Sequence, residues 1–183
     1  MAKNQKLDAH LINEAGRQRM LSQRAALGVA TLLNKIYLKQ DIDELTRTYI
    51  TDSTNLLLTS HKTLIAENTT EEIKTLYFSG DPSLNDEVLA YCAAALSISQ
   101  ANKMSDINPS DLSYFEAENV SYLLFRLNIM VIAYEDDAQS KLQDGIFVGT
   151  ILWLILLITL ISEYNFLLKP TINLIQKSVN KQG

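Results

Sequence analysis

The 183-residue sequence has little of what cross-links or interrupts a chain: it contains one cysteine, three prolines and six glycines. The single cysteine, Cys92, excludes an internal disulfide and has no neighbouring thiol with which to hold a metal. We expect it to be a small buried helix residue. Because proline and glycine interrupt helices, their scarcity leaves long stretches of helix formers, and the sequence predicts an all-α fold.

Histidine and excess positive charge are scarce as well. His10 and His61 each lack a second ligand three or four residues away, so we expect surface or hydrogen-bonded polar residues and no histidine metal site. The net charge of -5 argues against a nucleic-acid partner. No serine–histidine–aspartate set, glycine-rich phosphate loop or catalytic carboxylate pair has the required spacing, and we therefore expect neither an enzyme nor a cofactor.

One long run lacks charge altogether: residues 145–162 contain no Asp, Glu, Lys or Arg. A membrane span needs about 17–25 predominantly apolar residues, so we expect a transmembrane helix over residues 145–168. Residues 1–144 would then form one helical-bundle domain, and residues 169–183 would form a juxtamembrane segment.

The charges beside this run predict an orientation. After residue 168 come Lys169, Lys177 and Lys181 without an acidic residue, whereas residues 135–144 before the run contain four acidic residues and one lysine. Because positive charge is retained in the cytoplasm, we expect a cytoplasmic C-terminus and the large N-terminal domain on the outer side of the membrane. Residues 1–11 contain no signal peptide or span that would export this domain, so we expect an N-terminal span to be missing.

The segment 12–24 contains three arginines in an otherwise acidic chain. If residues 12–37 form a helix, one stripe of positions that begins in this segment has alternating spacings of four and three residues, the period of a coiled-coil seam. The members of this stripe are Ile12, Gly16, Arg19, Gln23, Ala26, Ala30, Leu33 and Tyr37. Two copies of Arg19 at about 6 Å across a two-fold axis would repel by roughly 3 kcal/mol at an effective dielectric constant of about 20. A small oxyanion between them would relieve that repulsion.

Two interpretations of this segment are open from the residues alone. Gly16, one turn before Arg19, would let a backbone or a ligand approach closely, at a cost of about 1 kcal/mol relative to alanine. Alternatively, Arg17 and Arg24 lie seven residues apart on a neighbouring stripe as solvated charges, with Glu14 pairing locally to Arg17.

The string from Ala15 to Arg24, AGRQRMLSQR, resembles the first helix of the PilJ or NarX-like sensor domain. That domain is the N-terminal part of type IV pilus chemotaxis transducers and of related histidine kinases and diguanylate cyclases. The similarity covers most of residues 8–170 and includes LYFSG, DEVLAY and AYE at residues 76–80, 86–91 and 133–135. The resemblance implies an antiparallel four-helix bundle that dimerises through its first helix and passes ligand-driven helix movement across the bacterial inner membrane.

The resemblance also implies roles for individual residues. In nitrate-sensing members, the arginine three residues after the Ala–Gly pair binds the anion together with its dimer mate, and Arg19 with Gly16 stands at that place. Arg17 and Gln18 differ from the small polar and apolar residues of the nitrate sensors, so we expect a small anion, nitrate-like or another oxyanion. The residues expected to bind it are Gly16, Arg17, Arg19, Gln23 and Arg24.

Two other functions fit the residues. One is a membrane-anchored helical interaction protein whose Arg17 and Arg24 dock the acidic surface of a partner protein, which the lack of any output module in this sequence favours. The other is a truncated remnant of a longer receptor whose N-terminal span and output domain are missing.

Capping residues predict where the first helices begin. We expect a first helix over about residues 5–39, and a second that starts at Asp41 with Glu44 reaching back to it. The same spacing predicts that Thr69 caps a short helix ending near Phe78.

Proline and glycine predict the later boundaries. A turn over residues 79–82 precedes a helix over residues 84–101. Asn108 then caps a last helix, with a proline at its first position. We expect this helix to run without a stop to Leu168, so that it continues into the span, and to end or kink at Pro170.

Overall fold

The computed structural model describes residues 2–67 and 70–172, and every regular element within them is helical. In chain order the elements are α1 (Ala2–Tyr37), α2 (Glu44–Glu67), α3 (Glu71–Phe78), α4 (Leu84–Ser99), the 3-10 turn η1 (Met104–Asp106), α5 (Pro109–Ser113), α6 (Ala117–Glu163) and the π-helical turn η2 (Tyr164–Leu168). The predicted all-α fold is confirmed. The chain divides into two compact units, Met1–Ala138 and Gln139–Gly183.

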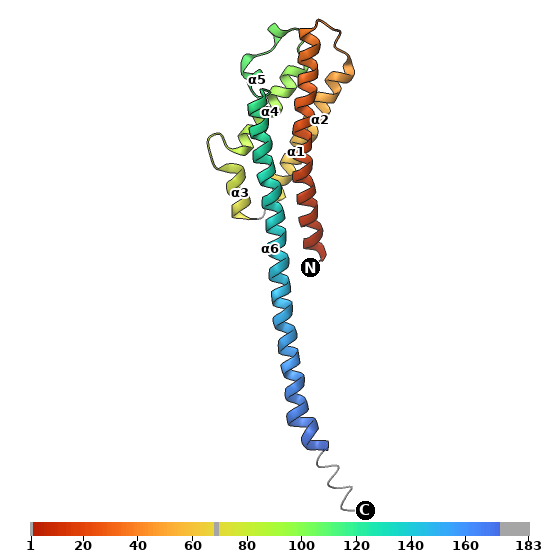
Figure 1. Ribbon diagram of the computed structural model, residues 1–183, viewed down its shortest axis with the longest axis vertical. Helices are drawn as coiled ribbons and strands as arrows, with labels where there is room; N and C mark the ends of the chain where they lie inside the picture. Colours follow the sequence, from red (N-terminus) through yellow and green to blue (C-terminus); the bar gives the residue numbers. More distant parts are fainter. Residues whose placement is uncertain (1, 68–69, 173–183) are drawn as a thin grey trace, which may run out of the picture. The chain divides into compact units, whose positions relative to one another are not determined.

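The first unit is an antiparallel bundle. In Figure 1, α1 and α4 run in one direction, while α2 and the part of α6 within this unit run in the other. The main core takes apolar side chains from these four helices and from α3, among them Leu21, Leu57, Tyr77, Val88 and Leu127. A second buried cluster joins α1, α2 and α4 through Val29, Leu32, Ile50, Ala95 and Ile98. The burial of these faces holds the helices together, because each helix presents one apolar stripe to the others.

The start of α2 differs from the prediction. The capping residue is Asp43, whose Oδ1 accepts from the backbone N–H of Thr46 at 2.7 Å. The predicted cap Asp41 was wrong because α2 begins at Glu44, which places Asp41 outside the reach of the free N–H groups. Lys35 donates to the other oxygen of Asp43 at 2.7 Å, and hydrogen bonds from Lys35 and Thr46 hold the pKa of Asp43 well below its usual range. This contact ties the end of α1 to the start of α2.

The boundaries between α3 and α4 lie close to the predicted ones. Thr70 caps α3 by accepting from the backbone N–H of Ile73, whereas the predicted cap Thr69 lies outside the described residues. The expected turn follows, with Gly80 at φ +96°, a conformation that glycine adopts without strain. α4 then begins at Leu84, as predicted.

The predicted unbroken last helix is wrong. Asn108 caps a helix as expected, but α5 ends at Ser113 and α6 begins at Ala117. Between them, Phe115 packs against the core with its ring centroid 4.8 Å from that of Tyr91. The backbone leaves the helical path where the half-buried ring of Phe115 meets Tyr91, and burying apolar surface of this kind is favourable.

The second unit contains the rest of α6 and the residues after it. By length and composition alone, the described chain has one helix, Ala117–Ile172, that could cross a membrane, and the most apolar part of that helix is exposed. Gly145 and Gly149 lie inside it without interrupting it. The boundaries expected for the span, 145–168, stay a prediction. Two of the lysines used to orient it lie outside the described residues, Lys177 and Lys181.

Pro170 does not end the helix, because residues 169–172 remain helical. The π-helical turn η2 comes just before it. Proline has no N–H, and its ring meets the carbonyl group four residues earlier in a regular α-helix. The wider π turn accommodates both effects within the helix.

Candidate functional site

The arginine segment lies in α1, and the face that α1 buries is one residue away from the predicted seam. The buried positions also repeat at spacings of four and three, at Leu11, Ala15, Gln18, Ser22, Ala25, Val29 and Leu32. Every member of the predicted stripe is half-buried or exposed in this chain. The stripe therefore borders the core of the bundle, and Arg19 lies at the surface of the subunit.

Arg19 contacts α6 of its own chain. Its Nη1 donates to Oδ1 of Asn128 at 2.7 Å, across 109 positions of sequence. The arginine is exposed and the asparagine is half-buried, so this contact lies at the edge between α1 and α6. A neutral amide oxygen is a weaker partner for a guanidinium group than a carboxylate or another anion.

The other two arginines contact different surfaces. Arg17 lies 3.5 Å from Glu14 through Nη1 and Oε1, which confirms the local pairing predicted for these residues. Arg24 places its guanidinium carbon 5.2 Å from the centroid of the Tyr49 ring on α2, a cation–π geometry. The three arginines are thus directed to α6, along α1 and to α2, and within one subunit they do not converge on a single point.

The remaining predicted site residues have little contact within the subunit. Gly16 is half-buried, and a Cβ atom built on it would meet nothing within 4 Å. Gln23 is exposed. The closest approach on α1 is at Gly28 instead, where a Cβ would lie 2.7 Å from Cγ1 of Ile50 and 3.1 Å from Cδ1 of Tyr49. The subunit itself therefore requires glycine at residue 28 and not at residue 16.

A buried polar chain connects the arginine segment to the centre of the bundle. The side-chain nitrogen of Gln18 lies 2.7 Å from Nδ1 of His61 on α2, and Nε2 of His61 lies 3.1 Å from Oδ1 of Asn85 on α4. Gln18 and His61 are fully buried. Burial lowers the pKa of His61 below its ordinary value, so the ring is held neutral, one nitrogen donating and the other accepting.

The polar chain is incomplete at one atom. Within the described part of the chain, Oε1 of Gln18 has no hydrogen-bond partner, although it is buried. A buried polar atom without a partner costs roughly 1–3 kcal/mol. The first half of α1 therefore carries a local destabilisation, one residue away from both Arg17 and Arg19.

The comparisons with known proteins address this helix directly. Residues 1–77 match the PilJ family. The description of that family is "Type IV pili methyl-accepting chemotaxis transducer N-term", and the match covers α1, α2 and α3 as far as Tyr77. The predicted resemblance is confirmed over these residues. A search of curated proteins and a search of solved structures each found no match.

The match covers less than half of the chain. The arginine segment and the first two members of the polar chain, Gln18 and His61, lie inside the matched residues, whereas Asn85 and Asn128 lie outside them.

The histidines and the cysteine show no arrangement for metal binding or catalysis in the described residues. His10 is exposed, and His61 is a hydrogen-bonded core residue, as one of the two expectations for it stated. Cys92 is buried as predicted, and burial raises its pKa to about 12, which leaves an unreactive thiol. No group of three or more His, Cys, Asp or Glu side chains in the described residues could hold a metal ion.

The hydrogen bond between buried Gln18 and His61 was not predicted from the sequence. The signal was present in part, because Gln18 falls on a stripe of four and three with Leu11, Ala15 and Ala25. His61 gave no such signal, since its partners are 43 and 24 positions away.

Proposed function

We propose that this chain is the ligand-sensing part of a bacterial transmembrane signal transducer, and that it binds a small anion through Arg19 at a homodimer interface formed by α1. The observation that carries the proposal is the state of Arg19. It is an exposed guanidinium on the PilJ-matched helix, and its partner is the neutral side chain of Asn128. An oxyanion offers this group a charged acceptor for two parallel hydrogen bonds.

The exposed face of α1 supports the dimer in this proposal. Met20 and Leu27 are 44% and 61% exposed, and they lie on the same side of α1 as Arg24. Spacings of four and three separate these residues, which is the period of a two-helix seam. Gly16 meets nothing in its own subunit, so a second helix would have room to approach at that point.

The Asn128 contact suggests how binding is relayed. An anion that takes the guanidinium of Arg19 removes its hydrogen bond to Asn128, and with it one link between α1 and α6. α6 includes the apolar run, so a changed contact at residue 128 acts on the helix proposed to cross the membrane. The anion changes the balance between the arrangements of α1 and α6 with and without this hydrogen bond, to the extent that it binds one of them more tightly than the other.

The proposed location follows from the apolar helix and the PilJ match. We place the transducer in the bacterial inner membrane, with residues 1–144 outside and the C-terminus in the cytoplasm. Lys169 follows the apolar run, as the positive-inside rule requires of the cytoplasmic side.

The proposal is tested by calorimetry on the full chain in lipid nanodiscs, with nitrate, nitrite, phosphate and acetate as separate titrants. We expect one of these anions to bind, and Arg19→Ala to abolish its binding. Arg19→Lys should weaken binding by about tenfold or more, because an ammonium group lacks the planar fork. Asn128→Ala should leave binding intact or tighten it, since it removes the competing acceptor. Silence of all four anions, or binding that survives Arg19→Ala, would contradict the proposal.

A second function is favoured by the exposure of Arg17 and Arg24. In this alternative, the face of α1 that carries both arginines and Leu27 docks a partner protein with an acidic surface. Capture of such a partner should then depend on Arg17→Ala and Arg24→Ala more than on Arg19→Ala. The anion proposal predicts the opposite order for ligand binding.

A further inference from the structure

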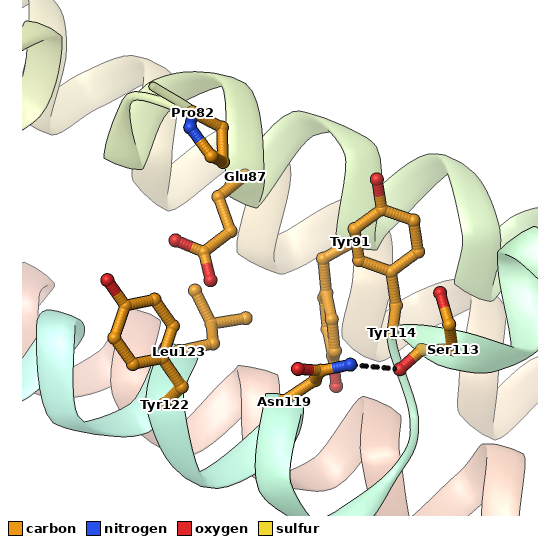
Figure 2. Close-up of a pocket in the computed structure, with 8 residues that line it drawn as sticks. All are labelled: Pro82, Glu87, Tyr91, Ser113, Tyr114, Asn119, Tyr122 and Leu123. Atoms are coloured by element: carbon orange, nitrogen blue, oxygen red, sulfur yellow. Dashed lines mark hydrogen bonds between the residues drawn. The ribbon is translucent and has the colours of Figure 1, made fainter. Parts of the chain in front are cut away.

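A pocket lies in the first unit among α4, α5 and α6, away from the arginine segment. Its volume is about 290 Å³, near the lower end of the range for small-molecule sites. Figure 2 shows the carboxylate of Glu87 and the rings of Tyr91, Tyr114 and Tyr122 around the hollow. Asn119 closes one side of it, where its amide nitrogen donates to the carbonyl oxygen of Ser113 at 2.8 Å.

The walls of this pocket combine π faces with one carboxylate. Glu87 is the charged side chain in the lining, and its side chain is only 12% exposed. Tyr91 is buried, Tyr114 is half-buried and Tyr122 is 55% exposed. Tyrosine rings present a negative face to a cation, and a carboxylate beside such rings adds a charged acceptor.

Arg126 shows that the edge of this pocket stabilises a cation. Its guanidinium carbon lies 5.8 Å from the centroid of the Tyr122 ring. Its Nη1 lies 2.5 Å from Oε2 of Glu87 and 3.3 Å from the carbonyl oxygen of Pro82. The contact between Arg126 and Glu87 in the described chain uses Oε2, which leaves Oε1 for a second donor.

The charge of the segments around the pocket is mainly negative. Residues 75–125, which supply its lining, contain seven acidic residues and one basic residue, Lys103. Such a distribution attracts cations and disfavours anions. It contrasts with the arginine segment, where the exposed charges are positive.

We propose that this pocket binds a small organic cation whose ammonium group lies beside Glu87 and whose apolar part contacts Tyr114 and Tyr122. The ammonium group donates to the free carboxylate oxygen, and the rings surround the rest of the molecule. This site is separate from the anion site proposed at Arg19, and it does not depend on a dimer. Both sites reach α6, one through Arg126 and the other through Asn128.

The test is calorimetry on the full chain in nanodiscs with phenethylammonium chloride as the probe. Two matched probes of nearly the same shape accompany it: neutral 2-phenylethanol and anionic phenylacetate. We expect phenethylammonium to bind at least about tenfold more tightly than either, because only it offers Glu87 a positively charged donor, whereas the hydroxyl of 2-phenylethanol is a neutral one.

Variants assign the binding to the pocket. Glu87→Gln should weaken phenethylammonium binding by about tenfold or more. Tyr122→Leu, at an exposed side chain that the core does not need, should weaken it by roughly three- to tenfold. Arg126→Gln should tighten it, because this change removes the internal cation that competes for Glu87. Glu118→Gln removes the same charge outside the pocket and should change the affinity by less than about twofold.

The results that overturn the proposal are equally specific. It is wrong if phenethylammonium does not bind, if 2-phenylethanol or phenylacetate binds as tightly, or if Glu87→Gln and Tyr122→Leu both leave the affinity unchanged. Loss of binding in Arg126→Gln would show that the arginine holds the ligand, which also contradicts a cation site. Glu87→Gln breaks an ion pair, so hydrogen exchange in α4 checks that this variant folds. If Glu87→Gln unfolds, the affinity of Tyr122→Leu decides the test.

Discussion

The two halves of α1 differ in the side chains that they bury and in the surroundings of their glycines. Up to Arg24, its inward positions include the polar side chains of Gln18 and Ser22, and its glycine touches nothing. After that point, Val29 and Leu32 are fully buried, and Gly28 lies where a Cβ would collide with α2. Both halves contribute apolar side chains to the core, among them Leu21 and Leu32, but the first half of α1 also buries the polar side chains of Gln18 and Ser22. The stability of the first half therefore depends on satisfied buried hydrogen bonds, and that of the second half on close apolar packing.

The largest expected effect is on the polar chain of the first half. His61→Ala leaves Gln18 and Asn85 without their partner and opens a cavity, so we expect a loss of about 3 kcal/mol in the free energy of unfolding. The measurement is hydrogen exchange of α1 and α2 peptides in the detergent-solubilised chain. His10→Ala, at the exposed histidine, is the matched control and should change the same quantity by less than about 0.5 kcal/mol. Equal effects of the two variants would show that the polar chain is not structural.

The next effect compares the two glycines directly. Gly28→Ala should lower the free energy of unfolding by about 1–3 kcal/mol, because the new Cβ meets Ile50 at 2.7 Å and Tyr49 at 3.1 Å. Gly16→Ala should leave it unchanged or raise it by up to about 1 kcal/mol, since alanine favours helix and meets nothing there. Thermal unfolding monitored by near-ultraviolet circular dichroism distinguishes the pair. If Gly16→Ala instead separates dimers in solution, a partner helix approaches at that residue.

A smaller effect should appear on acidification. The folded state lowers the pKa of His61 below the ordinary value of 6.5, so the unfolded chain takes up this proton first. Stability is therefore full above that pH and falls as the pH drops below about 6.5, by at most about 1.4 kcal/mol per pH unit for this one group. Urea unfolding between pH 7 and pH 5 measures the slope, with His61→Gln as the comparison. A slope that persists unchanged in His61→Gln would assign it to other groups.

The smallest effects concern the two outer arginines. Arg24→Ala removes the cation–π contact to Tyr49 and should lower the free energy of unfolding by about 0.5–1 kcal/mol. Arg17→Ala removes an exposed pair with Glu14 and should lower it by no more than about 0.5 kcal/mol. Both are read by the same urea titration. The reverse order would mean that the contact to α2 contributes less than the pair along α1.

Much of the fold could be predicted because it depends on local chemistry. The asparagine cap at Asn108, the turn around Gly80 and the burial of Cys92 each follow from a residue and its neighbours in sequence. The break between α5 and α6 could not, because Phe115 is compatible with a helix and leaves it only to meet Tyr91 from another helix.

The face of α1 that the subunit buries could not be predicted from the sequence, and the residues expected to bind an anion stay a prediction. Two stripes of α1, one through Arg19 and one through Gln18, have the same spacing of four and three, so periodicity alone cannot choose between them. The stripe through Gln18 faces the core, where His61 provides a buried hydrogen-bond partner for the Gln18 amide.

The π turn before Pro170 has a geometric consequence for the end of the chain. An α-helix advances about 100° per residue, and a π turn places one more residue in the same turn. Residues 169–172 are therefore rotated by about 100° from the azimuth that an unbroken α-helix would give them. The π turn sets the rotational phase between the apolar run and Lys169, and its conversion to a regular α-helix would turn that lysine by about a quarter of a circle.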